Sequence, residues 1–140
     1  MQRKRIEKYL LLFAIGYCVY LAVEVTYRGF SFRLMGIAGG LALAGIGILE
    51  DLGMRKFRYP VRMAVSALLI TALELYSGFF SLKVLGVRMW DYRDQAFSLC
   101  DGLICPLFSL FWFFFSALGI CIADWCEDTF RIRQMEKKRV

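Results

Sequence analysis

The stretch that decides the fold is LFSLFWFFFSALGICIA, residues Leu107 to Ala123, which follows a boundary from Gly102 to Pro106. It contains almost no polar side chain, and an apolar run of this length is typical of a helix that crosses a membrane. Its aromatic block, residues 111–115, would cover all sides of a helix, so part of it must face lipid. The stretch predicts a membrane helix over residues 103–124.

Three earlier apolar runs predict three more membrane helices. The first covers residues 8–27; its clean apolar part spans only about 22 Å at 1.5 Å per residue, so the helix must continue through Glu24 to cross a core of about 30 Å. The second covers residues 33–50. The third covers residues 61–85 and begins after Pro60, which suits the first turn of a helix.

The composition agrees with a membrane protein. Hydrophobic residues make up 59% of the 140 residues, and the charged residues lie in short clusters between the apolar runs. A water-soluble domain of this size could not bury so much apolar surface. The sequence predicts a single-domain, all-α integral membrane protein with a bundle of four transmembrane helices.

The second run is rich in small residues, and Gly36 and Gly40 form a G-x-x-x-G spacing. In lipid the backbone has no partner outside the helix, so such a run stays helical and its small face allows another helix to approach closely. The G-x-x-x-G spacing has two open interpretations: helix packing within one chain, or contact between two copies of the chain.

Basic residues predict the orientation of the bundle. Thirteen Lys and Arg side chains lie in the basic tails (residues 1–7 and 125–140), at Lys8 and around the loop after the second run, against five around the other two loops. Positive charge favours the cytoplasmic side, so we expect both termini in the cytoplasm, residues 86–102 as an outer loop, and a place in the cell membrane. The net charge of +6 is therefore explained by contact with the lipid bilayer, and we expect no nucleic-acid partner.

The sequence contains no histidine and no asparagine. The commonest metal ligand and the commonest general base are therefore missing, and we expect no metal and no other cofactor. The carboxyl groups of Glu74 and Asp91 leave one enzymatic option, an acid–base pair at the outer face. No nucleophile is recognisable beside them, so we expect the protein not to be an enzyme. The five cysteines form no C-x-x-C pair, and we expect no disulfide.

Several polar groups should meet in the outer half of the bundle, and we call them the outer polar nest. Glu24 and Arg28 are spaced i,i+4 in the favourable order, and Glu74 lies inside the third run, where an unpaired charge costs about 2.5–3.5 kcal/mol. The outer loop adds Trp90-Asp91-Tyr92, whose rings also suit the membrane interface. The nest is either a binding or permeation site for a small polar or ionic solute, or a set of groups that satisfy one another and fix the loop.

Two local predictions concern helix ends. Asp101 is a suitable N-cap for the last helix. Glu50 and Asp51 lie at a helix C-terminus, where negative charge is unfavourable, so we expect Arg55, Lys56 or the C-terminal tail to hold them.

A family resemblance rests on several motifs. Trp90-Asp91-Tyr92 is followed by F-S-L at residues 97–99, G-L-I-C at 102–105 and F-S-L-F-W at 108–112, with E-L-Y-S-G at 74–78 upstream. This pattern resembles the family known as putative ABC-transporter permease, type IV. The sequence departs from it at Arg93, where the family usually has serine, and at Ser98, where it usually has asparagine.

The resemblance implies a permease-like role, and the sequence has no G-x-x-x-x-G-K-[ST] loop, so ATP would enter through a separate ATPase subunit. We therefore expect a transport or channel component. Four short helices barely enclose a path, so we also expect a homo-oligomer or another membrane subunit. The alternative is a non-transporting membrane subunit or scaffold that binds a protein partner or lipid.

Overall fold

The computed structural model describes residues 2–139, with the side chains of residues 5–131 and of Met135. Within this part of the chain there are four long α-helices: α1 (Gln2–Arg28), α2 (Arg33–Asp51), α3 (Tyr59–Lys83) and α4 (Pro106–Arg139). A one-turn 3-10 helix, η1 (Met54–Lys56), lies between α2 and α3. Each long helix contains a segment long and apolar enough to cross a membrane. The predicted all-helical fold with four such helices is confirmed for the described residues, and the side on which the termini lie stays a prediction.

The helices differ from the predicted spans mainly at the two termini. α1 already begins at Gln2, and α4 continues to Arg139, so the polar tails are helical. The reason is local: residues 124–139 contain no glycine or proline and several strong helix formers.

The last helix begins at Pro106 because the residues before it form a tight turn. Leu99 and Ile104 pair as an antiparallel bridge, and Asp101 within this turn has a φ of +56°. Asp101 is therefore not the N-cap of α4; it accepts a hydrogen bond of 2.8 Å from Arg88 instead. Sequence reasoning treated residues 101–106 as one regular helix start and missed the turn.

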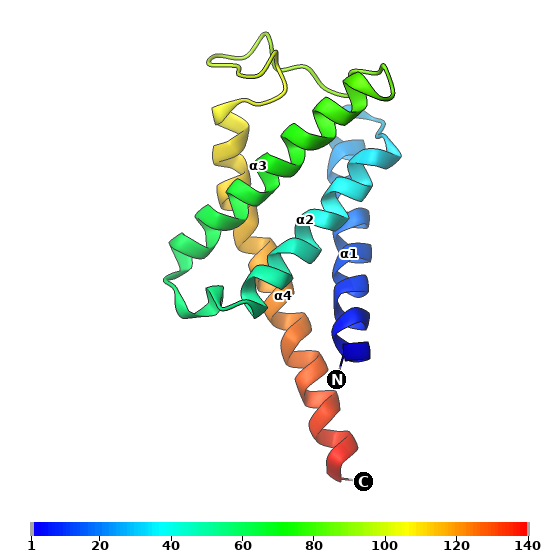
Figure 1. The fold of residues 1–140 in the computed structure, drawn as a ribbon, viewed down its shortest axis with the longest axis vertical. Coiled ribbons are helices and arrows are strands. Elements are labelled where there is room, and N and C mark those ends of the chain that lie inside the picture. Colours follow the sequence, from blue (N-terminus) through cyan, green and yellow to red (C-terminus); the bar gives the residue numbers. More distant parts are fainter. Residues whose placement is uncertain (1, 140) are drawn as a thin grey trace.

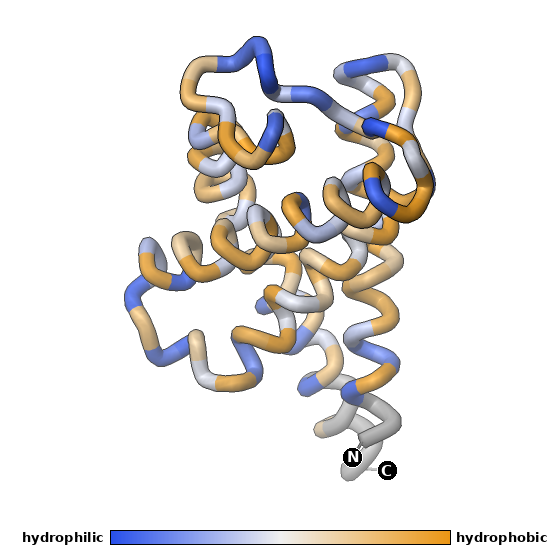
Figure 2. Tube along the Cα trace, turned by 45° about the horizontal axis from the view of Figure 1, so that its top comes forward, coloured by the Kyte–Doolittle hydropathy of each residue, from blue (hydrophilic) through white to orange (hydrophobic). Residues whose placement is uncertain are grey.

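The four helices run up and down, so the bundle has two distinct ends (Figure 1). The N-terminal end of α1 and the C-terminal end of α4 lie at one end of the bundle, which we call the terminal end, together with the loop that carries η1. The long segment 84–105 and the short turn 29–32 lie at the opposite end, the loop end. Figure 2 shows hydrophilic residues mainly in the connections at the two ends and hydrophobic residues along the helices.

Glycines allow α1 and α2 to pack more closely than any other pair of elements. A Cβ atom on Gly36 would lie 2.7 Å from the ring of Tyr17, and one on Gly40 would lie 2.8 Å from the carbonyl oxygen of Phe13. Of the two interpretations of the G-x-x-x-G spacing, the structure therefore shows packing within the chain. Two more glycines of this interface, Gly16 and Gly39, bring the two backbones together.

Candidate functional site

The Trp90–Tyr92 segment is fixed on the loop end of the bundle. Trp90 is buried, and its Nε1 donates a hydrogen bond of 3.1 Å to the carbonyl oxygen of Leu103. The indole lies over Gly78 of α3, where a Cβ atom would come within 3.0 Å of the ring. The loop is therefore fixed to α3 by the packing of Trp90 against Gly78. This packing needs an aromatic side chain in the loop and a glycine in the helix.

Glu74 lies beneath this loop and is held by two neutral donors. The hydroxyl of Tyr92 donates to its Oε1 at 2.9 Å, and the indole Nε1 of Trp112 donates to its Oε2 at 3.2 Å. Only 7% of Glu74 is exposed, and among the described side chains no basic group forms an ion pair with it. Burial raises the pKa of Tyr92, so its hydroxyl stays a donor at neutral pH.

Glu24 and Arg28 form the ion pair that their i,i+4 spacing predicts. Glu24 also accepts a hydrogen bond from Ser31, and Arg28 donates one of 3.0 Å to the carbonyl oxygen of Met89. The pair thus connects α1 both to the turn after it and to the loop that carries Trp90.

Asp91 does not join the buried groups. It pairs with Arg93 at 2.8 Å and lies 3.8 Å from Arg88, and 35% of its side chain is exposed. The hydrogen bonds from Arg93 hold the pKa of Asp91 down, at about 2. The outer polar nest therefore consists of a partly buried group around Glu24 and a buried group around Glu74, with Asp91 on the surface.

A cleft of about 300 Å³ lies beside these groups, between α1 and α4 and under the loop. Glu24 and Arg28 line it on one side, while Tyr92 and Trp112, the two donors to Glu74, line the other. The rest of its wall is mostly aromatic and comes from Tyr20, Tyr27, Trp90, Phe108, Phe111 and Phe115. The cleft reaches the surface, because Tyr27 is 82% exposed and Phe111 is 50% exposed.

A second, smaller cavity of about 80 Å³ adjoins the cleft between the helices. The two share Tyr20, Met35, Trp112 and Phe115, and Glu74 lines the smaller one. From there the cavity extends through apolar side chains toward the terminal end, as far as residues 46 and 122.

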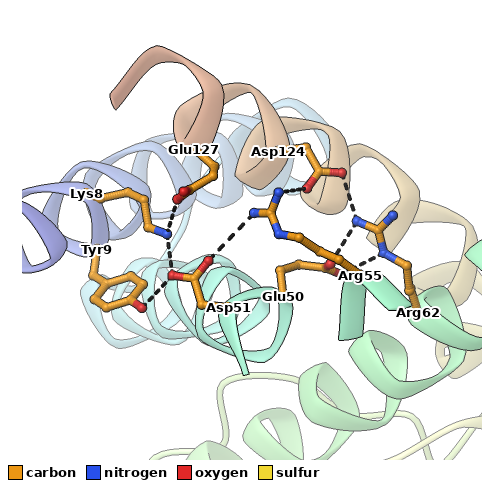
Figure 3. Close-up of polar contacts among 8 residues, drawn as sticks. All are labelled: Lys8, Tyr9, Glu50, Asp51, Arg55, Arg62, Asp124 and Glu127. Atoms are coloured by element: carbon orange, nitrogen blue, oxygen red, sulfur yellow. Dashed lines mark hydrogen bonds and ion pairs between the residues drawn. The ribbon is translucent and has the colours of Figure 1, made fainter. Parts of the chain in front are cut away.

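A network of ion pairs lies beyond this cavity, at the terminal end (Figure 3). Lys8 of α1 is 3% exposed; its ammonium group pairs with Asp51 of α2 and lies 2.8 Å from Glu127 of α4. Tyr9 donates a further hydrogen bond of 2.7 Å to Asp51. This half of the network joins three helices around one buried cation.

Two arginines form the other half of the terminal-end network. Arg62 lies 2.8 Å from both Glu50 and Asp124, and Arg55 lies 3.0 Å from Asp124 (Figure 3). The prediction that Arg55 holds the acids at the end of α2 agrees with its 3.7 Å distance to Asp51. The contacts of Lys8 and Arg62 were missed, because each of these residues was counted only as a charge that sets the orientation of the bundle.

Two other parts of the site were also missed. Tyr20 had no polar neighbour in sequence to mark it, and Trp112 lies in an aromatic block in which any member could face inward. The one available signal was the indole N–H of Trp112, since a buried indole usually finds an acceptor and Glu74 was one of two acids predicted within the outer half of the helices. The five cysteines are free thiols.

The fold and the site indicate the class of protein to which the chain belongs. Four apolar helices that surround a buried carboxyl group, with ion pairs and loops at the two ends, are typical of a small multi-pass membrane protein.

The family comparison makes this class specific. The model of the family described as "Putative ABC-transporter type IV" matches residues 10–138, so the chain belongs to this family, and the resemblance drawn from the sequence motifs is confirmed. No curated protein and no solved structure matches the chain.

Proposed function

We propose that this protein is a permease-like transport component that takes up a small solute at its loop end. One observation carries the proposal: the cleft, the buried Glu74 and the small cavity follow one another along the bundle, and ion pairs close the far end. An open site on one side and a closed barrier on the other is the arrangement that alternating access requires.

The cleft supports binding because its size and lining suit a small molecule. Its volume of about 300 Å³ lies at the lower end of the range for small-molecule sites. Most of its wall is apolar, and the Glu24–Arg28 pair supplies polar atoms at one side. Ionisable groups within membrane spans commonly mark the pathway of a substrate or ion.

The terminal-end network supports a closed barrier. Beneath the cavity, Leu12 and Leu43 pack against Cys126 in a buried cluster that joins α1, α2 and α4. The contacts of Lys8 and Arg62 join the same three helices and α3 just beyond this cluster. Opening this end would require these ion pairs to separate, so they are suited to act as a gate.

The proposal includes partners. A cavity of about 80 Å³ holds at most a few waters and gives no continuous path through one chain, so a second copy or another membrane subunit would complete it. Because the sequence has no P-loop motif, ATP hydrolysis would need a separate ATPase subunit. With the basic residues placed in the cytoplasm, such a subunit would meet the terminal end, and the cleft would face outward from the cell membrane.

Counterflow in proteoliposomes tests the proposal without the need for an energy source. Vesicles are loaded with a mixture of unlabelled sugars, amino acids and small organic ions, and the uptake of the labelled compounds is then measured. We expect uptake with the wild type and with Asp128→Asn, an exposed acid at the terminal end, and reduced uptake with Glu74→Gln. Equal uptake with Glu74→Gln would contradict the proposal. So would absence of uptake for every compound when the wild type is reconstituted together with any membrane subunit that co-purifies with it.

One observation favours a second candidate, a non-transporting subunit or scaffold. α4 continues to Arg139, beyond the apolar run that ends at Ala123, and projects past the rest of the bundle at the terminal end (Figure 1). Such a projecting helix is suited to contact a partner protein. Co-purification in mild detergent of a defined partner that binds α4, combined with absence of counterflow, would favour this candidate.

A further inference from the structure

We propose that the loop-end cleft takes a small organic cation with an apolar body, of the quaternary ammonium class. This inference deepens the proposed function and rests on it. It depends on three properties of the site, which are its charge, the faces of its aromatic side chains, and its few polar atoms.

The first property is the charge around the cleft. Glu24 and Arg28 form an ion pair and so neutralise each other. Glu74, directly behind the wall formed by Tyr92 and Trp112, receives hydrogen bonds from neutral donors, and no basic side chain pairs with it among the described residues. In its ionised form it leaves the site with one uncompensated negative charge in a poorly solvated place, and this attracts a cation.

The second property is the aromatic wall. The ring of Tyr20 is stacked with that of Trp112 at a centroid distance of 6.3 Å, and Tyr92 is stacked on Phe108 at 4.5 Å. Each stacked ring has one face covered by its partner, so only its other face can meet a ligand. An aromatic face carries negative potential, and sets of aromatic rings commonly recognise quaternary ammonium groups. Trp90 and Phe111 add two further rings to the same cleft.

The third property is the small number of polar atoms in the cleft, which argues against the other ligand classes. A sugar needs many hydrogen-bond partners, and the cleft is lined largely by apolar side chains. An anion would find Arg28 already engaged with Glu24 and with the carbonyl oxygen of Met89, and would meet the uncompensated charge of Glu74. A quaternary ammonium ion has no N–H group to satisfy, so an aromatic wall with one acid behind it suits its chemistry.

Equilibrium dialysis against protein in lipid nanodiscs, with empty nanodiscs as the blank, tests this inference. The two probes are benzyltrimethylammonium and neopentylbenzene, which have the same shape because a carbon replaces the charged nitrogen. We expect the wild type to bind the cation at least about ten-fold more tightly than its neutral isostere. Glu74→Gln should remove most of this preference, and Asp128→Asn should leave it unchanged.

A second variant guards against a folding defect in Glu74→Gln. Tyr20→Leu removes one aromatic face without changing the partners of Glu74, and we expect it to weaken cation binding while size-exclusion profiles match those of the wild type. Equal binding of the two probes by the wild type would overturn the inference but leave a small-molecule cleft, as the proposed function requires. Binding of neither probe would also overturn the inference, and the proposed function is then judged by counterflow alone.

Discussion

Replacement of Lys8 by methionine tests the barrier at the terminal end. Lys8 is almost fully buried and places a positive charge between Asp51 and Glu127 (Figure 3). Methionine keeps an unbranched apolar side chain of similar length, so the change removes the charge with little change in packing. Asp51 keeps its contacts with Tyr9 and Arg55, whereas Glu127 loses its ion pair with Lys8.

The structure sets the expected size of the effect. Removal of one partner from a fully buried ion pair costs about 3–5 kcal/mol, because the other charge stays buried without compensation. Here the side chains of Asp51 and Glu127 are 20% and 30% exposed, so water reaches both carboxylates. We therefore expect Lys8→Met to lower the free energy of unfolding by about 2–3 kcal/mol.

Reversible unfolding by SDS in mixed micelles measures this difference. The same substitution at Lys56, an exposed lysine of η1, is the matched control and should change the free energy of unfolding by less than about 0.5 kcal/mol. A triple variant with Asp51→Asn and Glu127→Gln added to Lys8→Met leaves no unpaired charge and should recover most of the lost stability. A Lys8→Met protein as stable as the Lys56 control would refute the assignment of a buried, ion-paired Lys8.

Three further predictions concern the helix contact and the loop. Gly16→Ala should lower the free energy of unfolding by about 1–3 kcal/mol, because its Cβ would lie 2.5 Å from a backbone oxygen of α2. The control Gly45→Ala, whose Cβ would meet only the flexible end of a side chain, should change the free energy of unfolding by less than about 1 kcal/mol. Equal losses in the two variants would contradict this packing. Trp90→Phe removes a buried hydrogen bond and should cost about 1–3 kcal/mol, with faster hydrogen exchange in residues 84–105; unchanged exchange would argue against its anchoring role. Asp91 should titrate with a midpoint of about 2 by NMR, so the stability that its pairing contributes falls as the pH drops from about 4 to about 2. Arg93→Gln should move the midpoint up toward about 3.9. A midpoint near 3.9 in the wild type would show that the pair does not form in solution.

Membership of the family does not say which residues act in the site, so this must be argued from the side-chain contacts of this chain. In this chain Arg93 pairs with Asp91, and that acid stays on the surface. The acid that faces the interior is Glu74, from the E-L-Y-S-G segment of α3. Variants that separate the effects of Glu74 from those of Asp91 therefore address the function most directly.

The sequence by itself determined the features that depend on one segment at a time. Long apolar runs must form helices in a membrane because no other structure satisfies their backbone groups, and this predicted all four helices. The i,i+4 spacing likewise predicted the Glu24–Arg28 pair, since one turn of helix brings those side chains together. The cost of a charge in an apolar layer predicted that Glu74 faces protein or water or carries a proton, and the structure shows it buried against protein.

Only the tertiary structure decided which distant residues meet. The rotation of each helix about its axis depends on packing against its neighbours, and this rotation selects Trp112 from the aromatic block as a donor to Glu74. It also turns Lys8 inward to meet Asp51, 43 residues away. The irregular turn before Pro106 places Asp91 outside and Tyr92 inside, which no pattern along the chain indicates.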